Sequence, residues 1–324
     1  MVDLKEIKNS TFLVTGGAGF IGSHIVEFLI AHQAKRVVVL DNLSTGFLEN
    51  LSAYLNFSNF EFIQGDITCY EDCLKACKGI DFVSHQAALG SVPRSIENPI
   101  ATHEANATGF INMLMACKDQ KVQRVVYASS SSVYGDISDS PKTESRIGKP
   151  LSPYAVSKLV NEQYAAIFSS VYQMKIVGLR YFNVFGPRQN PKGDYAAAIP
   201  LFIDSVLNDK DVFINGNGEQ SRDFTFVSNA VQGNILALLK PFSNTMNDVF
   251  NIAFGSSVTV NELYFEIAGL LSCSKKPIYR SERFGDVLHS KADITKAKQV
   301  LSFEPLVNFH EGLSETVNWF KNSH

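Results

Sequence analysis

The chain has 324 residues, of which 45% are hydrophobic and 19% are charged, and its formal net charge of −3 gives a pI near 6.2. This length predicts a sizeable core and two lobes. The weak charge argues against a nucleic-acid or membrane-surface partner. No apolar run reaches the roughly 20 residues of a membrane span. The polar start, MVDLKEIKNS, does not resemble a secretion signal, so we expect a cytoplasmic protein.

Six short segments of the first half are rich in β-branched residues and mostly apolar, as strands covered on both faces should be. They span residues 11–15, 36–40, 60–63, 81–85, 124–128 and 175–180. Helical patterns lie between them, at about 20–33, 69–78, 99–120 and 153–172. This alternation predicts an α/β fold with a doubly wound parallel sheet, whose ligands bind beyond the carboxyl ends of the strands.

The second half has a different rhythm, with frequent glycine and proline and with helical patterns at about 196–208, 228–240 and 260–271. We therefore expect a nucleotide-binding domain over residues 1–180 and a smaller α/β lobe over residues 181–324, with the chain crossing between them more than once.

Cys69, Cys73 and Cys77 recur every four residues and so would lie on one helix face. Metal sites normally use closer cysteine pairs together with a second cluster. We therefore expect small buried side chains there, free thiols throughout, and no metal ion.

The segment TFLVTGGAGFIGSHIVEFLI contains a strand, a glycine turn and the start of a helix, with Gly16, Gly19 and Gly22 at G-x-x-G-x-x-G spacing. Such glycines permit a tight turn, close approach of a pyrophosphate and close packing of helix on strand. The helix N-terminus then meets the phosphates. Because strand and helix flank the triplet correctly, the segment predicts a dinucleotide site.

Asp41 ends the second predicted strand, 19 residues after Gly22. A carboxylate at this place accepts hydrogen bonds from both ribose hydroxyls and repels a 2′-phosphate, which favours NAD over NADP. The alternative is a turn or cap residue. Asp66, which ends the third strand, is either a contact to the adenine amino group or a helix cap.

Tyr154 and Lys158 lie four residues apart in a predicted helix and therefore share a face. An ammonium close to a phenol lowers the phenol pKa toward the working pH. Ser130 lies 24 residues before Tyr154, in a run of four serines that directly follows a strand. A polar cluster at the carboxyl edge of a sheet is typical of a functional site, and otherwise a solvated turn.

The motifs TGGAGFIGSH, YAVSK and RYFNVFGPR together resemble the extended short-chain dehydrogenase/reductases, which have a Rossmann fold, and within them the nucleotide-sugar 4-epimerases. The resemblance spans Phe12 to about Phe320. It implies tightly bound NAD and a UDP-sugar substrate. It also implies Tyr154 as the base, Lys158 as its pKa partner and ribose ligand, and Ser130 as the hydroxyl that orients the substrate.

The resemblance also implies two sets of contacts. The cofactor contacts are Gly16, Gly19, Phe20, Ile21, Gly22, Asp41, Asn42, Ser44, Thr45, Gly46, Asp66, Ile67, Gln86, Ala87, Ala88, Asn106, Tyr154 and Lys158. The substrate contacts are Gly90, Ser91, Arg94, Ser130, Ser131, Ser132, Tyr154, Asn183, Ala197, Arg222, Arg283, Asp286 and Ser290. Guanidinium groups such as those of Arg222 and Arg283 suit a diphosphate.

Positions at which this sequence differs from related enzymes argue against one reaction and favour one class of substrate. The run Ser130-Ser131-Ser132 stands where nucleotide-sugar 4,6-dehydratases carry Thr-Asp-Glu, so the carboxylates needed to expel water are missing. Gly90 and Ser290 stand where epimerases restricted to plain hexoses place a lysine and a tyrosine, and Ala197 is small too. Small residues leave room for a 2-acetamido group.

These features resemble most the bacterial UDP-N-acetylglucosamine 4-epimerases, which use transient oxidation at C4 and serve surface polysaccharide synthesis. Epimerisation of the 6-carboxylate form, which Arg94 would suit, or of UDP-glucose remains open. Two further alternatives are a keto-sugar reductase, which would consume its cofactor, and a non-enzymatic NAD(H) sensor. In the family the helices at 99–120 and 153–172 pair across a homodimer. Their apolar residues would equally fit burial within one chain.

Overall fold

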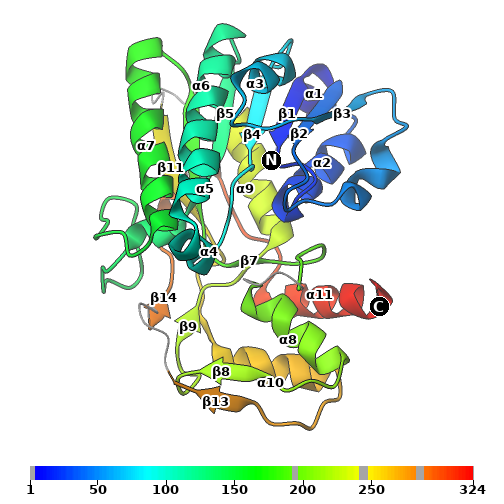
Figure 1. The fold of residues 1–324 in the computed structure, drawn as a ribbon, viewed down its shortest axis with the longest axis vertical. Helices are drawn as coiled ribbons and strands as arrows, with labels where there is room; N and C mark the ends of the chain where they lie inside the picture. The colour runs from blue at the N-terminus through cyan, green and yellow to red at the C-terminus, as the bar shows by residue number, and fades with distance from the viewer. Residues whose placement is uncertain (1–3, 192–195, 241–246, 282–287, 324) are drawn as a thin grey trace.

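The computed structural model describes residues 4–191, 196–240, 247–281 and 288–323. A seven-stranded parallel sheet organises the larger lobe, in the order β11-β6-β5-β4-β1-β2-β3 (Figure 1). Its strands are β1 (Thr11–Thr15), β2 (Arg36–Asp41), β3 (Phe60–Gln64), β4 (Phe82–His85), β5 (Arg124–Ser130), β6 (Ile176–Tyr181) and β11 (Asn247–Ile252). The doubly wound Rossmann fold is thereby confirmed.

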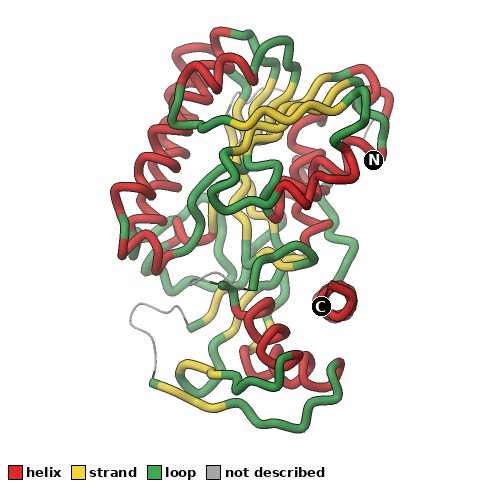
Figure 2. The backbone as a smooth tube through the Cα atoms, turned by 45° about the vertical axis from the view of Figure 1, so that its right-hand side comes forward, coloured by secondary structure: helices red, strands yellow, loops and turns green. Residues whose placement is uncertain are grey.

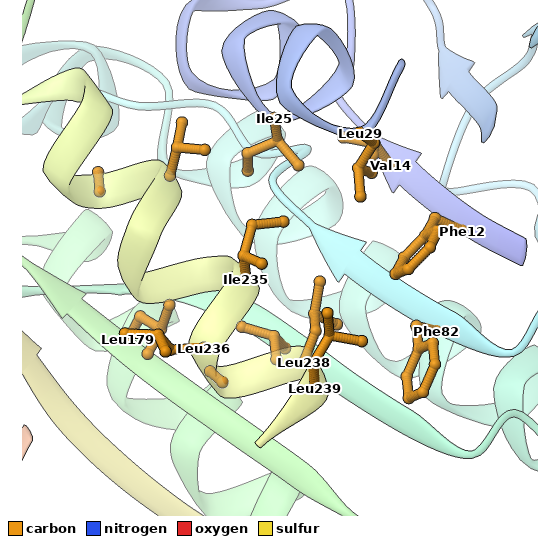
Figure 3. Packing of buried hydrophobic residues seen from close by; sticks show 14 of the residues in the cluster. Phe12, Val14, Ile25, Leu29, Phe82, Leu179, Ile235, Leu236, Leu238 and Leu239 are labelled. Atoms are coloured by element: carbon orange, nitrogen blue, oxygen red, sulfur yellow. The ribbon is translucent and has the colours of Figure 1, made fainter. Parts of the chain in front are cut away.

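Helices cover both faces of this sheet, because successive residues of a buried strand point to opposite sides. Val14 packs with Ile25 of α2 (Phe20–Ala31) and Ile235 of α9 (Val227–Leu239), as Figure 3 shows. Its neighbour Leu13 packs instead on the opposite face. The helices there are α3 (Tyr70–Ala76), α6 (Gly109–Asp119) and α7 (Pro153–Tyr172). Cys73 and Cys77 are buried in that second cluster, as expected, and the cysteines are free thiols.

Helix α7 has the bounds that the sequence predicts, because Pro153 occupies its first position and the Ser152 hydroxyl accepts a hydrogen bond from Ala155 N at 3.1 Å. The helix expected over 99–120 is confirmed, since the chain is helical without interruption from Pro99 to Asp119, but it contains a π-helical turn that the sequence did not predict. Its segments are α5 (Pro99–His103), the π-helical turn (Glu104–Thr108) and α6. The turn presents the buried Asn106 side chain to the loop after β4, where it bonds both backbone groups of Leu89. Such π turns often occur at functional sites.

The smaller lobe lies beyond the carboxyl ends of the strands (Figure 2). Its helices are α8 (Ala198–Leu207), α10 (Val260–Leu270) and α11 (Phe309–Ser323). Its short strand pairs are β8 (Phe213–Asn215) with β13 (Ile278–Arg280) and β7 (Val184–Phe185) with β10 (Thr225–Phe226). A third small sheet joins β12 (Val258–Thr259), β9 (Ser221–Arg222) and β14 (His289–Ser290). Phe185, Phe202, Leu263 and Phe309 are among its core residues.

Two elements that follow residue 180 lie with the first lobe, since β11 pairs with β6 and α9 packs on the sheet. The expected boundary at residue 180 stays a prediction. Short helices α1 (Leu4–Asn9) and α4 (Val92–Glu97) complete the described fold. None of the helices in the described ranges has the length and apolar character needed to span a membrane.

Candidate active site

A cavity of about 900 Å³ lies at the carboxyl ends of the large sheet's strands. Fifteen of its lining residues are predicted cofactor contacts: Gly16, Gly19, Phe20, Ile21, Gly22, Asp41, Asn42, Ser44, Thr45, Gly46, Asp66, Ile67, Gln86, Ala87 and Ala88. Ten more are predicted catalytic or substrate residues: Gly90, Ser91, Arg94, Ser130, Ser131, Ser132, Tyr154, Lys158, Asn183 and Ala197. The sheet therefore brings most of the predicted site to one cavity.

The glycine turn between β1 and α2 leaves no room for side chains. A Cβ on Gly16, whose φ is +67°, would lie 2.7 Å from Ala87 N, and one on Gly22 would lie 2.1 Å from the Gly16 carbonyl oxygen. Gly19 is the N-cap residue of helix α2 and supplies no side-chain cap, and the first turn of the helix lines the cavity. Backbone close to the cavity and an uncapped helix N-terminus are the features that a dinucleotide pyrophosphate requires, so this turn fits NAD.

Asp41 at the end of β2 has a structural role besides the predicted one. Its carboxylate accepts hydrogen bonds from Ala18 N at 2.9 Å and Leu43 N at 2.8 Å, which ties the glycine turn to the strand end. Burial raises its pKa, and these two bonds oppose the rise. The carboxylate also lines the cavity, at the position expected for a ribose ligand.

Asp66 after β3 is more exposed and accepts hydrogen bonds from Asn42 Nδ2 and from the backbone N–H of Thr68, both at 2.8 Å. Burial raises its pKa, but the hydrogen bonds outweigh burial and hold the pKa below its usual value. Asp66 is therefore ionised at neutral pH and lies beside Asn42 at the cavity wall.

Tyr154, Lys158 and Ser130 meet in the cavity. The Lys158 Nζ lies 5.8 Å from the Tyr154 ring centroid and donates to the Ala128 carbonyl of β5 at 2.8 Å. Burial lowers the pKa of Lys158 to about 8. Burial raises the pKa of Tyr154, whereas its hydrogen bond with Ser130 lowers it. In the chain without cofactor, burial is therefore the largest cause acting on the phenol pKa, and the expected lowering by Lys158 stays a prediction.

The turn that follows β5, Ser131–Tyr134 (the serine turn), holds the Ser130 hydroxyl in place. It accepts hydrogen bonds from the N–H of Ser132 at 3.1 Å and from its hydroxyl at 2.9 Å. Ser130 therefore links the serine turn to the phenol of Tyr154 through one oxygen.

Three predicted residues do not line the cavity. Asn106 is buried and donates to Ser157 Oγ at 3.1 Å, so it supports helix α7. Arg222 and Ser290 are register partners on β9 and β14, and Arg222 donates to the Ser221 carbonyl oxygen at 3.0 Å. Arg283 and Asp286 lie outside the described residues.

Asp223 is a buried residue that the sequence did not single out. Its carboxylate accepts hydrogen bonds from Ala292 N at 3.1 Å and from Phe254 N and Gly255 N at 3.2 Å, so it joins three segments. Burial raises its pKa to about 7. Its carbonyl oxygen accepts from Asn183 Nδ2 at 3.1 Å, which connects the Asn183 loop to the same junction.

Comparison with known proteins adds the family. Residues 12–253 match the model of the NAD dependent epimerase/dehydratase family. The structure is similar to a UDP-N-acetylglucosamine 4-epimerase from Methanobrevibacter ruminantium M1, solved with UDP-N-acetylmuramic acid (41% identity, TM-score 0.91, 97% of this chain and 99% of that one). It is also similar to a UDP-glucose 4-epimerase from Thermotoga maritima with UDP-glucose (36%, 0.90, 97% and 99%).

A third similar structure is the UDP-glucuronic acid 4-epimerase from Bacillus cereus, which was solved with UDP-glucuronic acid and NAD. It is 32% identical, with a TM-score of 0.90, over 97% of this chain and all of that one. The chain therefore belongs to the NAD-dependent epimerase/dehydratase family, and it is an enzyme that uses NAD.

Proposed function

We propose that the protein is a UDP-N-acetylglucosamine 4-epimerase, which interconverts UDP-GlcNAc and UDP-GalNAc by transient oxidation at C4. The observation that carries the proposal is the room beside Gly90 in the cavity, because a Cβ there would meet no atom within 4 Å. A 2-acetamido group needs such space, since it cannot enter a filled pocket without overpacking. The 41% identical relative named for this activity supports the same substrate.

The chain's own residues supply proton transfer and orientation. NAD, when bound, supplies a reversible two-electron acceptor for C4. Tyr154 takes the O4 proton and later returns it, while Ser130, hydrogen-bonded to Tyr154, orients the O4 hydroxyl. Because burial raises the Tyr154 pKa, phenolate formation would need the positive charge of Lys158 beside the phenol.

Tight nucleotide binding and a loosely held sugar suit this reaction, because the keto sugar must present its other face without leaving. We assign the diphosphate and uridine to Asn183 and Arg222, with Arg283 and Asp286 by family resemblance. Asn183 lines the cavity, and Arg222 on β9 is the register partner of Ser290 on β14.

The proposal is tested by incubating the purified protein with UDP-GlcNAc, UDP-glucose or UDP-glucuronic acid in separate reactions without added cofactor. We expect UDP-GalNAc to form faster than UDP-galactose or UDP-galacturonic acid, measured by chromatography of the nucleotide sugars. Conversion of none of the three, even with NAD added, would overturn the assignment.

A UDP-uronic acid 4-epimerase is the second candidate. Arg94 lines the cavity, and its guanidinium would pair with a 6-carboxylate. In the same experiment, faster conversion of UDP-glucuronic acid than of UDP-GlcNAc, abolished in Arg94→Gln, would favour this candidate.

We also propose a homodimer. Phe110 and Met113 of α6 are buried within the chain and cannot contribute to an interface. One face of α7 is exposed and apolar, with Val156 at 49%, Ile167 at 57% and Val171 at 62% exposure. These residues lie 11 and 4 positions apart, on one helical stripe. Analytical ultracentrifugation tests this face as the dimer interface: we expect the wild type to sediment as a dimer and Ile167→Asp as a monomer.

A further inference from the structure

A buried ion pair lies directly behind the candidate catalytic site. The Glu162 carboxylate of α7 accepts hydrogen bonds from Arg180 of β6, at 2.9 Å to Nε and 2.7 Å to Nη2. The side chains are only 9% and 5% exposed. Neither residue lines the cavity, so the pair does not touch substrate or cofactor.

A buried ion pair is weak support for stability, because desolvation of two charges offsets their attraction. Replacing both partners of such a pair by apolar residues is often neutral or stabilising, whereas removing one partner leaves an uncompensated buried charge. The pair is therefore better explained by what it holds than by the stability it adds.

The pair contacts both ends of the serine turn. Ser129 precedes the turn, and its hydroxyl donates to Glu162 Oε1 at 2.6 Å. Tyr134 ends the turn, and the Arg180 guanidinium carbon lies 4.8 Å from its ring centroid. Tyr134 is in turn held by Asn251 of β11, whose Oδ1 accepts from the phenol at 2.6 Å. Ser130, Ser131 and Ser132 therefore lie in the chain between two residues that the ion pair contacts, namely Ser129 and Tyr134.

The same pair fixes helix α7 along the sheet. Tyr154, Lys158 and Glu162 are spaced by four residues and lie on one helix face. Lys158 bonds the Ala128 carbonyl and Glu162 bonds the next residue, Ser129, so two successive turns of α7 contact two successive residues of β5. Sliding of the helix along the strand would break both contacts.

We propose that Glu162, paired with Arg180, is a positioning residue, which sets the register of α7 against β5 and thereby holds the Tyr154 phenol against the Ser130 hydroxyl. The inference rests on the proposed catalytic role of Tyr154 and Ser130. Misplacement by about 1 Å can lower a rate about 100-fold, so a small shift of α7 is enough.

The experiment compares three variants with the wild-type holoenzyme. Glu162→Gln keeps the shape of the side chain but removes its charge, and Ser129→Ala removes one hydrogen bond to it. Arg124→Gln is the matched control. Arg124 is a buried arginine at the start of β5, the strand that carries Ser129 near its other end. Its guanidinium donates to carbonyl oxygens at the end of α9.

We expect Glu162→Gln to lower kcat about 100-fold with little change in KM or in bound NAD. Ser129→Ala should lower kcat in the same direction by less. Loss of the Ser130 contact raises the Tyr154 pKa, so the rising limb of the kcat–pH profile should move to higher pH in both variants. Arg124→Gln should lower Tm and leave kcat and the pH profile unchanged.

A folded Glu162→Gln protein with the kcat and pH profile of the wild type would overturn the proposal. The same loss in Arg124→Gln would also overturn it, because the effect would then be general destabilisation. If Glu162→Gln does not fold, an unaltered pH profile in Ser129→Ala overturns the proposal instead.

A readout without turnover separates this inference from the proposed function. The tyrosinate absorbance titration of each protein is compared with that of the same protein carrying Tyr154→Phe, which isolates the Tyr154 pKa. A rise of this pKa in Glu162→Gln supports the positioning role even if wild type converts none of the UDP-sugars. If the wild type is fully active and Glu162→Gln has the same Tyr154 pKa as the wild type, the positioning role is overturned while the proposed function stands.

Discussion

Two glycines on different sides of the cavity have opposite surroundings. A Cβ on Gly22, in the turn before α2, would lie 2.1 Å from a backbone oxygen, whereas a Cβ on Gly90 would meet nothing within 4 Å. The first glycine lets backbone pack against backbone at the dinucleotide turn. The second leaves volume where the sugar is expected. The contrast shows that the chain is closely packed around the dinucleotide turn and leaves more space beside Gly90. A cofactor that stays bound needs the first, and a sugar that must turn over needs the second.

The largest effect is expected at the tight side. Gly22→Ala places a methyl group against the Gly16 carbonyl and must move the turn or the helix, at a cost of about 1–3 kcal/mol. We expect the purified variant to lack NAD and to show no turnover without added cofactor. The measurement is the NAD released on denaturation. Gly90→Ala is the matched control and should keep both NAD and activity, so equal NAD content in the two variants would break the comparison.

The next effect concerns the proton acceptor between the two halves. Tyr154→Phe removes the phenol hydroxyl, and loss of a general base typically lowers the rate about 10²–10⁴-fold. We expect kcat to fall within this range while NAD stays bound, because the glycine turn is untouched. Near-normal turnover in this variant would show that Tyr154 is not the base.

A third effect is on stability and its pH dependence. Burial lowers the folded-state pKa of Lys158 to about 8, below the 10.5 of an exposed lysine. The folded state therefore holds fewer protons than the unfolded state between these pH values, so stability rises with pH across them. Below pH 8 the buried ammonium costs about 3 kcal/mol.

Lys158→Met should therefore raise the free energy of unfolding of the cofactor-free protein by about 3 kcal/mol at pH 7, and by much less at pH 10. Urea titration of the two proteins at both pH values measures the gap. A gap that widens as the pH rises would contradict the expected direction.

The smallest effect is expected at the open side. Gly90→Lys fills the room beside the sugar and should reduce the preference for UDP-GlcNAc over UDP-glucose about tenfold, within the 10–200-fold range of pocket-size discrimination. The ratio of the two kcat/KM values measures it. An unchanged ratio would mean that the acetamido group lies elsewhere.

Six of the seven strands of the large sheet and helix α7 could be predicted from the sequence because their signals are local, whereas β11 was not predicted. The strands of the sheet are apolar runs, and Ser152–Pro153 is a standard helix start. The helix over 99–120 was predicted but its π-helical turn was not, because the bonds of Asn106 to Leu89 and Ser157 join distant segments. The dinucleotide site could be predicted for the same reason, since its three motif glycines lie within the short segment Gly16–Gly22.

The supporting residues of the site could not be predicted in this way. Asp223 bonds Ala292, 69 residues away, and Ser129 bonds Glu162, 33 residues away. Such contacts depend on how β5, β6 and α7 pack, which no local pattern reports. The family pattern also placed Arg222 and Ser290 among the substrate contacts; the structure pairs them on β9 and β14, outside the residues that line the cavity, and their contact with substrate stays a prediction.

The most direct test of the central claim uses UDP-GlcNAc with deuterium at C4 and the purified protein without added cofactor. Mass spectrometry of the UDP-GalNAc formed shows whether the label stays at C4. The account predicts full retention, because the retained cofactor takes and returns the same hydrogen while Tyr154 moves only the O4 proton. Loss of the label to solvent, or product formed only with stoichiometric added cofactor, would contradict it.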